Sequence, residues 1–199
     1  GNSGGILQSG IAVCDLFLED GLIVAVANDR LKDRSYRKEP QQKWSANPRQ
    51  ILKGVPIAVL VDEFTASVAE IVAACLQDHK RATIVGSRSF GNASVQTITT
   101  LSSGTGAIRL TTNEYQRPSG ASLNRSSTSR DSDAWGVRPD SNFAFSPTRK
   151  QLEDWITWRQ DRDHVRSAQS NATLDPGGLL PRNADPVLGR ALTLFDFQK

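Results

Sequence analysis

The feature of the sequence that most limits the possible folds is the run Val55–Val61, VPIAVLV, together with the turn and helix pattern directly after it. A strand without polar positions is typical of a mainly parallel sheet that is covered on both faces. A short turn, Asp62–Ala66, comes next, and apolar residues then recur at helical spacing over Ser67–Asp78. A strand, a turn and a helix in this order predict an α/β domain built in layers.

The same periodicities predict further elements on both sides of this junction. We expect helices over Gln8–Leu18, Arg149–Ala168 and Asp185–Phe195, and strands over Leu22–Ala27, Thr83–Val85, Val95–Thr100 and Ala107–Thr112, the last two as a hairpin. The helix over 149–168 is charged and amphipathic. Polar segments connect these elements: a long connection with room for one weak strand at 29–53, a loop at 117–140 and a linker at 170–185.

Composition narrows the possible function classes. The chain has 199 residues, of which 38% are hydrophobic and 23% charged, and these values are ordinary for one globular domain. Its net charge is only +3, and Lys and Arg are scattered among Asp and Glu, so we expect no nucleic-acid partner. No apolar run approaches the roughly 18 residues of a membrane-spanning helix, so we expect no membrane span.

The cysteines and histidines do not support a metal centre. Cys14 and Cys75 both lie in apolar surroundings, where buried free thiols are expected rather than a disulfide framework. His79 and His164 do not combine with them at the spacing of a metal site. We therefore expect neither a metal ion nor another cofactor.

Ser67 stands where the predicted strand has ended and the predicted helix begins. A side chain there is exposed at the carboxyl end of a sheet, and the free N–H groups of a helix N-terminus are the parts of an oxyanion hole. The pair Ser67 and Glu70 also has the S-x-x-E spacing of a capping box, in which the serine only caps the helix. Spacing alone favours the cap, and both interpretations remain open.

A nucleophilic serine needs a base within hydrogen-bond reach. The nearest histidine, His79, lies at the other end of the same predicted helix, about 18 Å away at 1.5 Å per residue. His164 lies in the polar tail. A Ser-His-Asp triad is therefore not expected.

The segment 55–97, VPIAVLVDEFTASVAEIVAACLQDHKRATIVGSRSFGNASVQT, resembles the signature core of the carboxyl-terminal processing peptidases, also called tail-specific proteases, of the S41 serine peptidase family. In that family a buried strand leads to a serine nucleophile in the context S/T-A-S-A-x-E. A helix ending in Q-D-x-x-R-A comes after it. The motif F-G-K-x-x-V-Q then carries a lysine general base and a glutamine that orients it.

Three further motifs extend the resemblance over residues 1 to 140. They are Asn2–Leu7, similar to the family's N-P-G-G-L-L turn, Leu110–Gly120, similar to its L-T-T…Y…P-S-G stretch, and Trp135–Asp140, similar to its G-I/V-x-P-D end. The resemblance implies a layered β–α core like those of the crotonase and ClpP folds at residues 1–145, and then a helical C-terminal extension at 146–199.

The resemblance also implies that this core is truncated at its N-terminus. The chain has no Met and begins at the turn, whereas the family has a strand, a PDZ-like peptide-binding domain and a helical region before it. We therefore expect the chain to be a piece of a larger peptidase.

The resemblance implies the site residues position by position. Ser67 takes the nucleophile position and Gln96 that of the orienting glutamine. The backbone amide of Val68 and one from Gly4 or Gly5 are expected to form the oxyanion hole. The family's lysine falls on Asn92, whose side chain can donate a hydrogen bond but cannot act as a base.

The function implied is that of a serine endopeptidase of the C-terminal processing type, which hydrolyses peptide bonds of polypeptide C-termini through Ser67 in a Ser-Lys type site. Loss of a general base costs on the order of 10²–10⁴ in rate, so Asn92 predicts little turnover. The alternative is a peptide-binding pseudoprotease that has kept Ser67, the oxyanion amides and Gln96. A plain α/β domain with Ser67 as a cap is the third possibility.

The family acts outside the cytoplasm, which implies a periplasmic or secreted location. No targeting signal is present in this chain, and the sequence indicates no oligomeric state.

Overall fold

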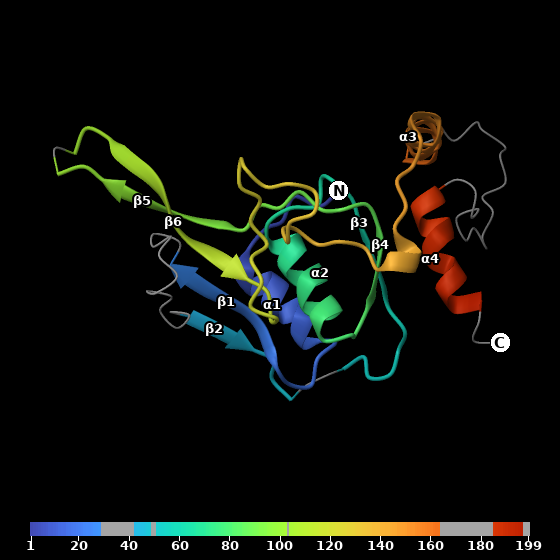
Figure 1. The fold of residues 1–199 in the computed structure, drawn as a ribbon, viewed down its shortest axis with the longest axis horizontal. Helices are drawn as coiled ribbons and strands as arrows, with labels where there is room; N and C mark the ends of the chain where they lie inside the picture. The colour runs from blue at the N-terminus through green and yellow to red at the C-terminus, as the bar shows by residue number, and fades with distance from the viewer. Residues whose placement is uncertain (29–41, 49–50, 103, 164–184, 197–199) are drawn as a thin grey trace, which may run out of the picture.

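The computed structural model describes residues 1–28, 42–48, 51–102, 104–163 and 185–196 (Figure 1). Its elements, in chain order, are α1 (Leu7–Asp15), β1 (Leu22–Asn28), β2 (Gln42–Ser45), β3 (Ala58–Val61), α2 (Val68–Asp78), β4 (Thr83–Gly86), β5 (Ser94–Thr100), β6 (Ala107–Gln116), the short 3-10 helix η2 (Ser141–Phe143), α3 (Arg149–Asp163) and α4 (Pro186–Asp196). The predictions for 29–41 and 164–184, which include most of the linker, the end of the helix predicted to Ala168 and His164, lie outside the described residues.

The strands form two sheets on either side of a helical layer. A four-stranded antiparallel sheet has the order β2-β1-β6-β5, and β3 pairs with β4 in parallel. In Figure 1, α1 and α2 lie between the larger sheet and the parallel pair. One cluster of buried side chains joins these layers, with Cys14 from α1, Ile23 from β1, Ile71 from α2 and Ile84 from β4 all at most 2% exposed. The predicted α/β layering is confirmed.

The strand predicted over Val55–Val61 is shorter and less covered than expected. Only Ala58–Val61 forms a strand, and Leu60 within it is 42% exposed. Pro56 has no N–H to donate to a ladder, which disfavours an earlier start. Because the Leu60 side chain is so exposed, the prediction that both faces of this strand are covered is wrong for the described residues.

Helices α1 and α2 pack at a glycine. A Cβ built on Gly10 would lie 2.4 Å from Cγ1 of Val68, so only a residue without a side chain allows this approach. Helix α1 ends at Asp15, earlier than the predicted Leu18. Cys14 and Cys75 are both buried and free, as the sequence predicted.

The two C-terminal helices, α3 and α4, differ in how closely they pack against the rest of the described structure. Helix α4 packs against β3 and β4 and buries Ala191, while Asp185 Oδ1 caps its first turn by accepting from two backbone amides at 3.0 and 2.9 Å. On α3, Leu152 and Ile156 remain 40% and 41% exposed. The apolar face predicted for this helix is therefore not buried against the described residues.

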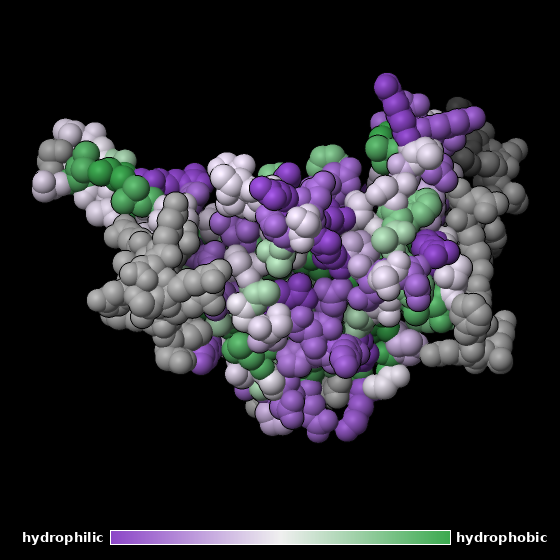
Figure 2. Space-filling view, in the orientation of Figure 1, coloured by the Kyte–Doolittle hydropathy of each residue, from purple (hydrophilic) through white to green (hydrophobic). Residues whose placement is uncertain are grey.

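The hairpin of β5 and β6 projects from the body (Figure 1) and carries an apolar patch (Figure 2). Ile98, Ile108 and Leu110 are 69%, 46% and 47% exposed. Strand β6 continues to Gln116, beyond the predicted Thr112, because its second half pairs with β1. Within the described part of the chain, no helix combines the length and apolar character that a membrane crossing requires.

Candidate active site

Ser67 occupies a strained position at the junction between β3 and α2. Its backbone has φ 58° and ψ −127°, and Lys80 is the only other residue with a side chain that has positive φ in the described ranges. A conformation of this kind costs about 1–3 kcal/mol and persists only where surrounding contacts impose it. The sharp turn from strand to helix presents the serine at the helix N-terminus, as nucleophile elbows do.

The contacts of Ser67 and Glu70 bear on the choice between a cap and a nucleophile. The two residues form the arrangement of a capping box, and the Ser67 amide donates to Glu70 Oε2 at 3.0 Å. The Glu70 amide, however, donates to the Ser67 carbonyl oxygen at 2.9 Å, and the serine side chain forms no capping hydrogen bond. The Glu70 side chain thus supplies one hydrogen bond of the capping box, and the Ser67 side chain occupies the other position of the box.

Glu70 is completely buried, and its carboxylate joins Ser67 to Asn92, the predicted nucleophile and base positions. Oε2 accepts from the Asn92 amide at 2.8 Å as well as from the Ser67 amide. Oε1 accepts from the Gly91 amide at 2.7 Å and from the Ser89 hydroxyl at 2.5 Å. Charge-assisted hydrogen bonds are stronger than neutral ones, so this one carboxylate fixes two loops that are far apart in the sequence.

Sequence reasoning identified Glu70 only as a capping partner and missed Ser89. The signal for Glu70 was the S-x-x-E spacing itself. Ser89 carries no comparable signal, because its role comes from tertiary contacts: its hydroxyl donates to Glu70 and accepts from the Val137 amide at 2.7 Å.

Gly4 brings the N-terminal turn against Ser67. It has φ 100°, and a Cβ built on it would lie 2.8 Å from the Ser67 Cβ and 3.0 Å from the Val68 nitrogen. The Gly4 amide is already used, since it donates to Asn2 Oδ1 at 2.9 Å. The amides of Val68 and Gly5 form no hydrogen bond with any described residue. Of the two glycines predicted for the oxyanion hole, Gly5 is the one with a free donor.

The side chains of Asn92 and Gln96 point to other partners. Asn92 is exposed, and its Oδ1 accepts from the Ser94 hydroxyl at 3.1 Å. Gln96 is exposed on β5, and its Oε1 accepts from Nε of Arg109 on β6. Within the described ranges neither side chain hydrogen-bonds to Ser67, so the structure brings the backbone of the predicted site together but not its side chains.

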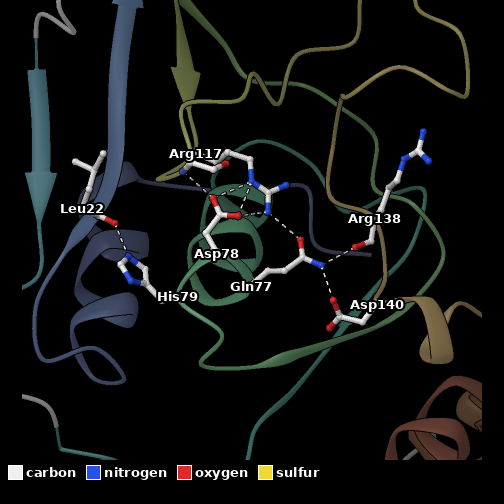
Figure 3. Close-up of polar contacts among 8 residues, drawn as sticks. Leu22, Gln77, Asp78, His79, Arg117, Arg138 and Asp140 are labelled. Atoms are coloured by element: carbon white, nitrogen blue, oxygen red, sulfur yellow. Dashed lines mark hydrogen bonds and ion pairs between the residues drawn. The ribbon is translucent and has the colours of Figure 1, made fainter.

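The C-terminal end of α2 holds two further segments by hydrogen bonds (Figure 3). Arg117 donates to both carboxylate oxygens of Asp78, with the shortest contact 2.6 Å, and to Gln77 Oε1 at 2.9 Å. Gln77 Nε2 in turn donates to the Arg138 carbonyl at 2.8 Å and to Asp140 Oδ1 at 3.0 Å. The motif Q-D on the helix thus binds the loop that begins at Arg117 and the segment that ends at Asp140.

These hydrogen bonds lower the pKa of the Asp78 carboxyl. Burial opposes its ionisation, but the hydrogen bonds from Arg117 and from the Ser119 amide outweigh burial and hold its pKa below the ordinary value of 3.8. The pair is largely shielded, with side chains 14% and 15% exposed. It therefore anchors the loop at neutral pH.

The residues next to Asp78 are structural. His79 Nε2 lies 2.7 Å from the Leu22 carbonyl oxygen, which ties α2 to β1 and agrees with the prediction that this histidine is not the base (Figure 3). Arg81 donates to three backbone carbonyl oxygens, those of Phe17, Leu52 and Val55. No group of three or more potential metal ligands occurs in the described part of the chain.

Comparison with known proteins supplies independent information. The family model for peptidase family S41 matches residues 1–143. The carboxy-terminal-processing protease of Bartonella bacilliformis is 35% identical over 177 residues, 88% of this chain and 39% of that protein. The carboxyl-terminal-processing protease of a Synechocystis species is 38% identical over 117 residues, 59% of this chain and 25% of that protein.

Among solved structures, that of a photosystem II D1 C-terminal processing protease matches 73% of this chain and 33% of its own chain, with a TM-score of 0.61 and 31% identity. The chain therefore spans well under half the length of each of these relatives.

Proposed function

The chain belongs to peptidase family S41, whose model covers residues 1–143, and on this premise we propose that it carries the Ser67 site of a C-terminal processing serine endopeptidase. Its substrate would be a polypeptide cleaved near its C-terminus. We also propose an extracytoplasmic location, as the family resemblance implies.

The observation that carries this proposal is the hydrogen-bond network of Glu70. Its carboxylate accepts from the amides of Ser67 and Asn92 at 3.0 and 2.8 Å, so the positions of nucleophile and base meet at one buried oxygen. A plain helix cap needs no such link to a loop more than twenty residues further on. This network supports a catalytic interpretation of the junction over the cap alone.

The proposed chemistry is acyl transfer. The Ser67 hydroxyl attacks the scissile carbonyl and loses its proton to water, and the carbonyl oxygen becomes negatively charged in the tetrahedral intermediate. The C–N bond then breaks, the leaving amine takes up a proton, and water hydrolyses the ester formed on Ser67. The unpaired amides of Val68 and Gly5 are the donors that would bind this oxyanion. The close approach of Gly4 to Ser67 supports this arrangement, because it places the turn against the nucleophile.

Proton removal from Ser67 is the weak step. Asn92 stands in the base position, and an amide cannot take up the serine proton. We therefore propose slow turnover, with a loss on the order of 10²–10⁴ relative to a site with a working base.

The second candidate function is peptide binding without cleavage. The observation in its favour is that the Asn92 side chain is bonded to Ser94 and that of Gln96 to Arg109, so neither is arranged to assist Ser67. The oxyanion amides would still bind a carbonyl group of a peptide.

Restoring a lysine tests both candidates. We expect Asn92→Lys in the full-length protein to raise cleavage of an unstructured polypeptide, monitored by mass spectrometry, by about 10²-fold or more. The double variant with Ser67→Ala should remove the gain. Cleavage that is lost with Ser67→Ala but unchanged by Asn92→Ala would show that another group is the base. No gain with Asn92→Lys would favour the peptide-binding function.

A further inference from the structure

An open cavity of about 350 Å³ lies next to the loop that carries Asn92. It is lined by Phe90, Gly91, Arg125, Ser126, Ser127 and Ser129. Gly91 also donates its amide to the Glu70 carboxylate at 2.7 Å. The cavity therefore shares one wall with the network that holds Ser67 in place.

Arg125 is an exposed residue of this cavity that stacks on Trp135. Its amide donates to the Gly91 carbonyl at 2.8 Å, and its guanidinium carbon lies 4.4 Å from the centre of the Trp135 ring. A Cβ built on Gly91 would lie 2.8 Å from the Arg125 Cβ and 2.9 Å from Cε3 of Trp135. Stacking uses the face of a guanidinium and leaves its N–H donors, which lie in the plane, free to bind a ligand.

The neighbouring arginines are already occupied, and Arg125 is not. Arg88 lies 3.3 Å from the centre of the same Trp135 ring, but its Nε and both Nη atoms donate to backbone carbonyls. Arg138 donates to two of the same carbonyls. The Arg125 side chain forms no hydrogen bond or ion pair with any residue that the structure describes.

The acidic residues of this segment do not neutralise Arg125. The Asp133 carboxylate accepts from the Arg130 amide at 2.7 Å and from the Ser132 hydroxyl at 3.3 Å. Neither Asp131 nor Asp133 forms an ion pair with a side chain in the described ranges. A stacked cation with unused donors thus lines the cavity.

The rest of the lining is suited to an organic anion. The Ser126 and Ser129 hydroxyls hydrogen-bond to each other at 2.9 Å, so at most one of their two protons remains for a ligand, while the Phe90 side chain is 56% exposed and provides an apolar wall. A planar guanidinium binds a carboxylate through two parallel N–H···O hydrogen bonds. We propose that this cavity is a subsite for a carboxylate of the polypeptide that is processed at Ser67, an inference that rests on the proposed function.

The carboxylate has two possible sources, the C-terminus of the substrate or an Asp or Glu side chain near the cleaved bond. Three fluorescein-labelled unstructured peptides distinguish them: one with a free C-terminus, the same peptide amidated at its C-terminus, and an amidated peptide that contains a Glu. Binding is measured by fluorescence anisotropy with full-length protein that carries Ser67→Ala, so that cleavage does not interfere.

We expect Arg125→Gln to weaken binding of the carboxylate-bearing peptide about 10-fold or more, and Arg125→Lys to weaken it less. Arg130→Gln is the matched control, because it removes the same charge from the same segment without lining the cavity. It should change binding less than about 3-fold. Circular dichroism checks that each variant is folded.

The outcomes separate the two proposals. Weaker binding of both amidated peptides identifies the terminal carboxylate, whereas tight binding of the amidated peptide that contains a Glu identifies a side-chain carboxylate. If all three peptides bind equally well and Arg125→Gln binds like its parent, the subsite is overturned while the peptide-processing function stands. If the parent protein binds none of the peptides, both proposals are overturned.

Discussion

The buried carboxylate of Glu70 accepts a hydrogen bond from the Ser67 amide at 3.0 Å. The same oxygen accepts from the Asn92 amide at 2.8 Å. One side chain therefore holds both the strained backbone of Ser67 and the loop that carries Asn92. The stability of the site and its chemistry should consequently respond together to changes at Glu70.

Replacement of Glu70 by Gln should destabilise the protein strongly. Four donors converge on this carboxylate, and an amide would turn one acceptor oxygen into a donor that faces them. We expect a loss of about 2–4 kcal/mol in the free energy of unfolding, measured by urea denaturation. Glu63→Gln is the control, because Glu63 is exposed and accepts only from the Ser87 hydroxyl among the described residues. Equal losses in the two variants would contradict the role of the network.

Gly4→Ala tests the contact between the N-terminal turn and Ser67. The new Cβ would overlap the Ser67 Cβ at 2.8 Å, and the positive φ of 100° adds strain. We expect a loss of about 3 kcal/mol in the free energy of unfolding. Gly120→Ala separates the two causes, since Gly120 has φ 80° but nothing within 4 Å of an added Cβ. The Gly120→Ala variant should lose only about 1 kcal/mol in the free energy of unfolding. A loss as large as that of Gly4→Ala would exclude the steric contact with Ser67 as the cause of the Gly4 effect.

The ion pair of Asp78 and Arg117 should make stability depend on pH in the acid range. The folded pKa of Asp78 lies below its ordinary value of 3.8, so the unfolded chain binds the proton at higher pH than the folded chain. The pair therefore stabilises the fold above that value and less as the pH falls toward the folded pKa. We expect Asp78→Asn to lose about 2 kcal/mol at pH 7, and the difference from wild type to shrink below pH 3.8.

Urea denaturation over a pH series measures this difference. Glu153→Gln is the control, because the exposed pair of Glu153 and Arg149 should contribute at most about 0.5 kcal/mol. A constant difference between wild type and Asp78→Asn from neutral to acid pH would rule out the ion pair as its cause.

The thiols of Cys14 and Cys75 should be unreactive in the folded protein. The hydrogen bond with Cys14, together with burial, raises the pKa of Cys75 above its ordinary value of 9.0. We expect a thiol reagent at pH 8 to label neither cysteine in native protein and both in urea. Rapid labelling of the native protein would mean that the packing of α1 on α2 opens readily.

The raised pKa also has a consequence at alkaline pH. The thiols of the unfolded chain ionise near pH 9 while the folded Cys75 stays neutral, so alkali favours unfolding. Stability should therefore be fully present below pH 9 and decrease above it. Cys75→Ala should reduce this alkaline decrease, and an unchanged pH profile would contradict the prediction.

Local patterns predicted the layered α/β fold well, because helix and strand periodicities are short-range properties. The helix of Ser67–Asp78 was placed within one residue of α2, and the predicted hairpin forms from β5 and β6. The predicted burial of the strand faces was wrong, because burial depends on which other elements cover the strand. Val55–Val61 has the pattern of a strand buried on both faces, yet β3 pairs only with β4 among the described strands and leaves Leu60 exposed.

Residue order alone was enough to locate the strand, turn and helix around Ser67, and the family resemblance predicts Asn92 in the base position. The long-range contacts became visible only in three dimensions. The Glu70 carboxylate accepts from the Ser67 amide at the helix N-terminus and also binds the Asn92 loop. Arg125 likewise stacks on Trp135 with its donors free. The physical reason is that a buried carboxylate or a stacked guanidinium takes its partners from whichever segments the fold brings near, and local periodicity carries no information about such contacts.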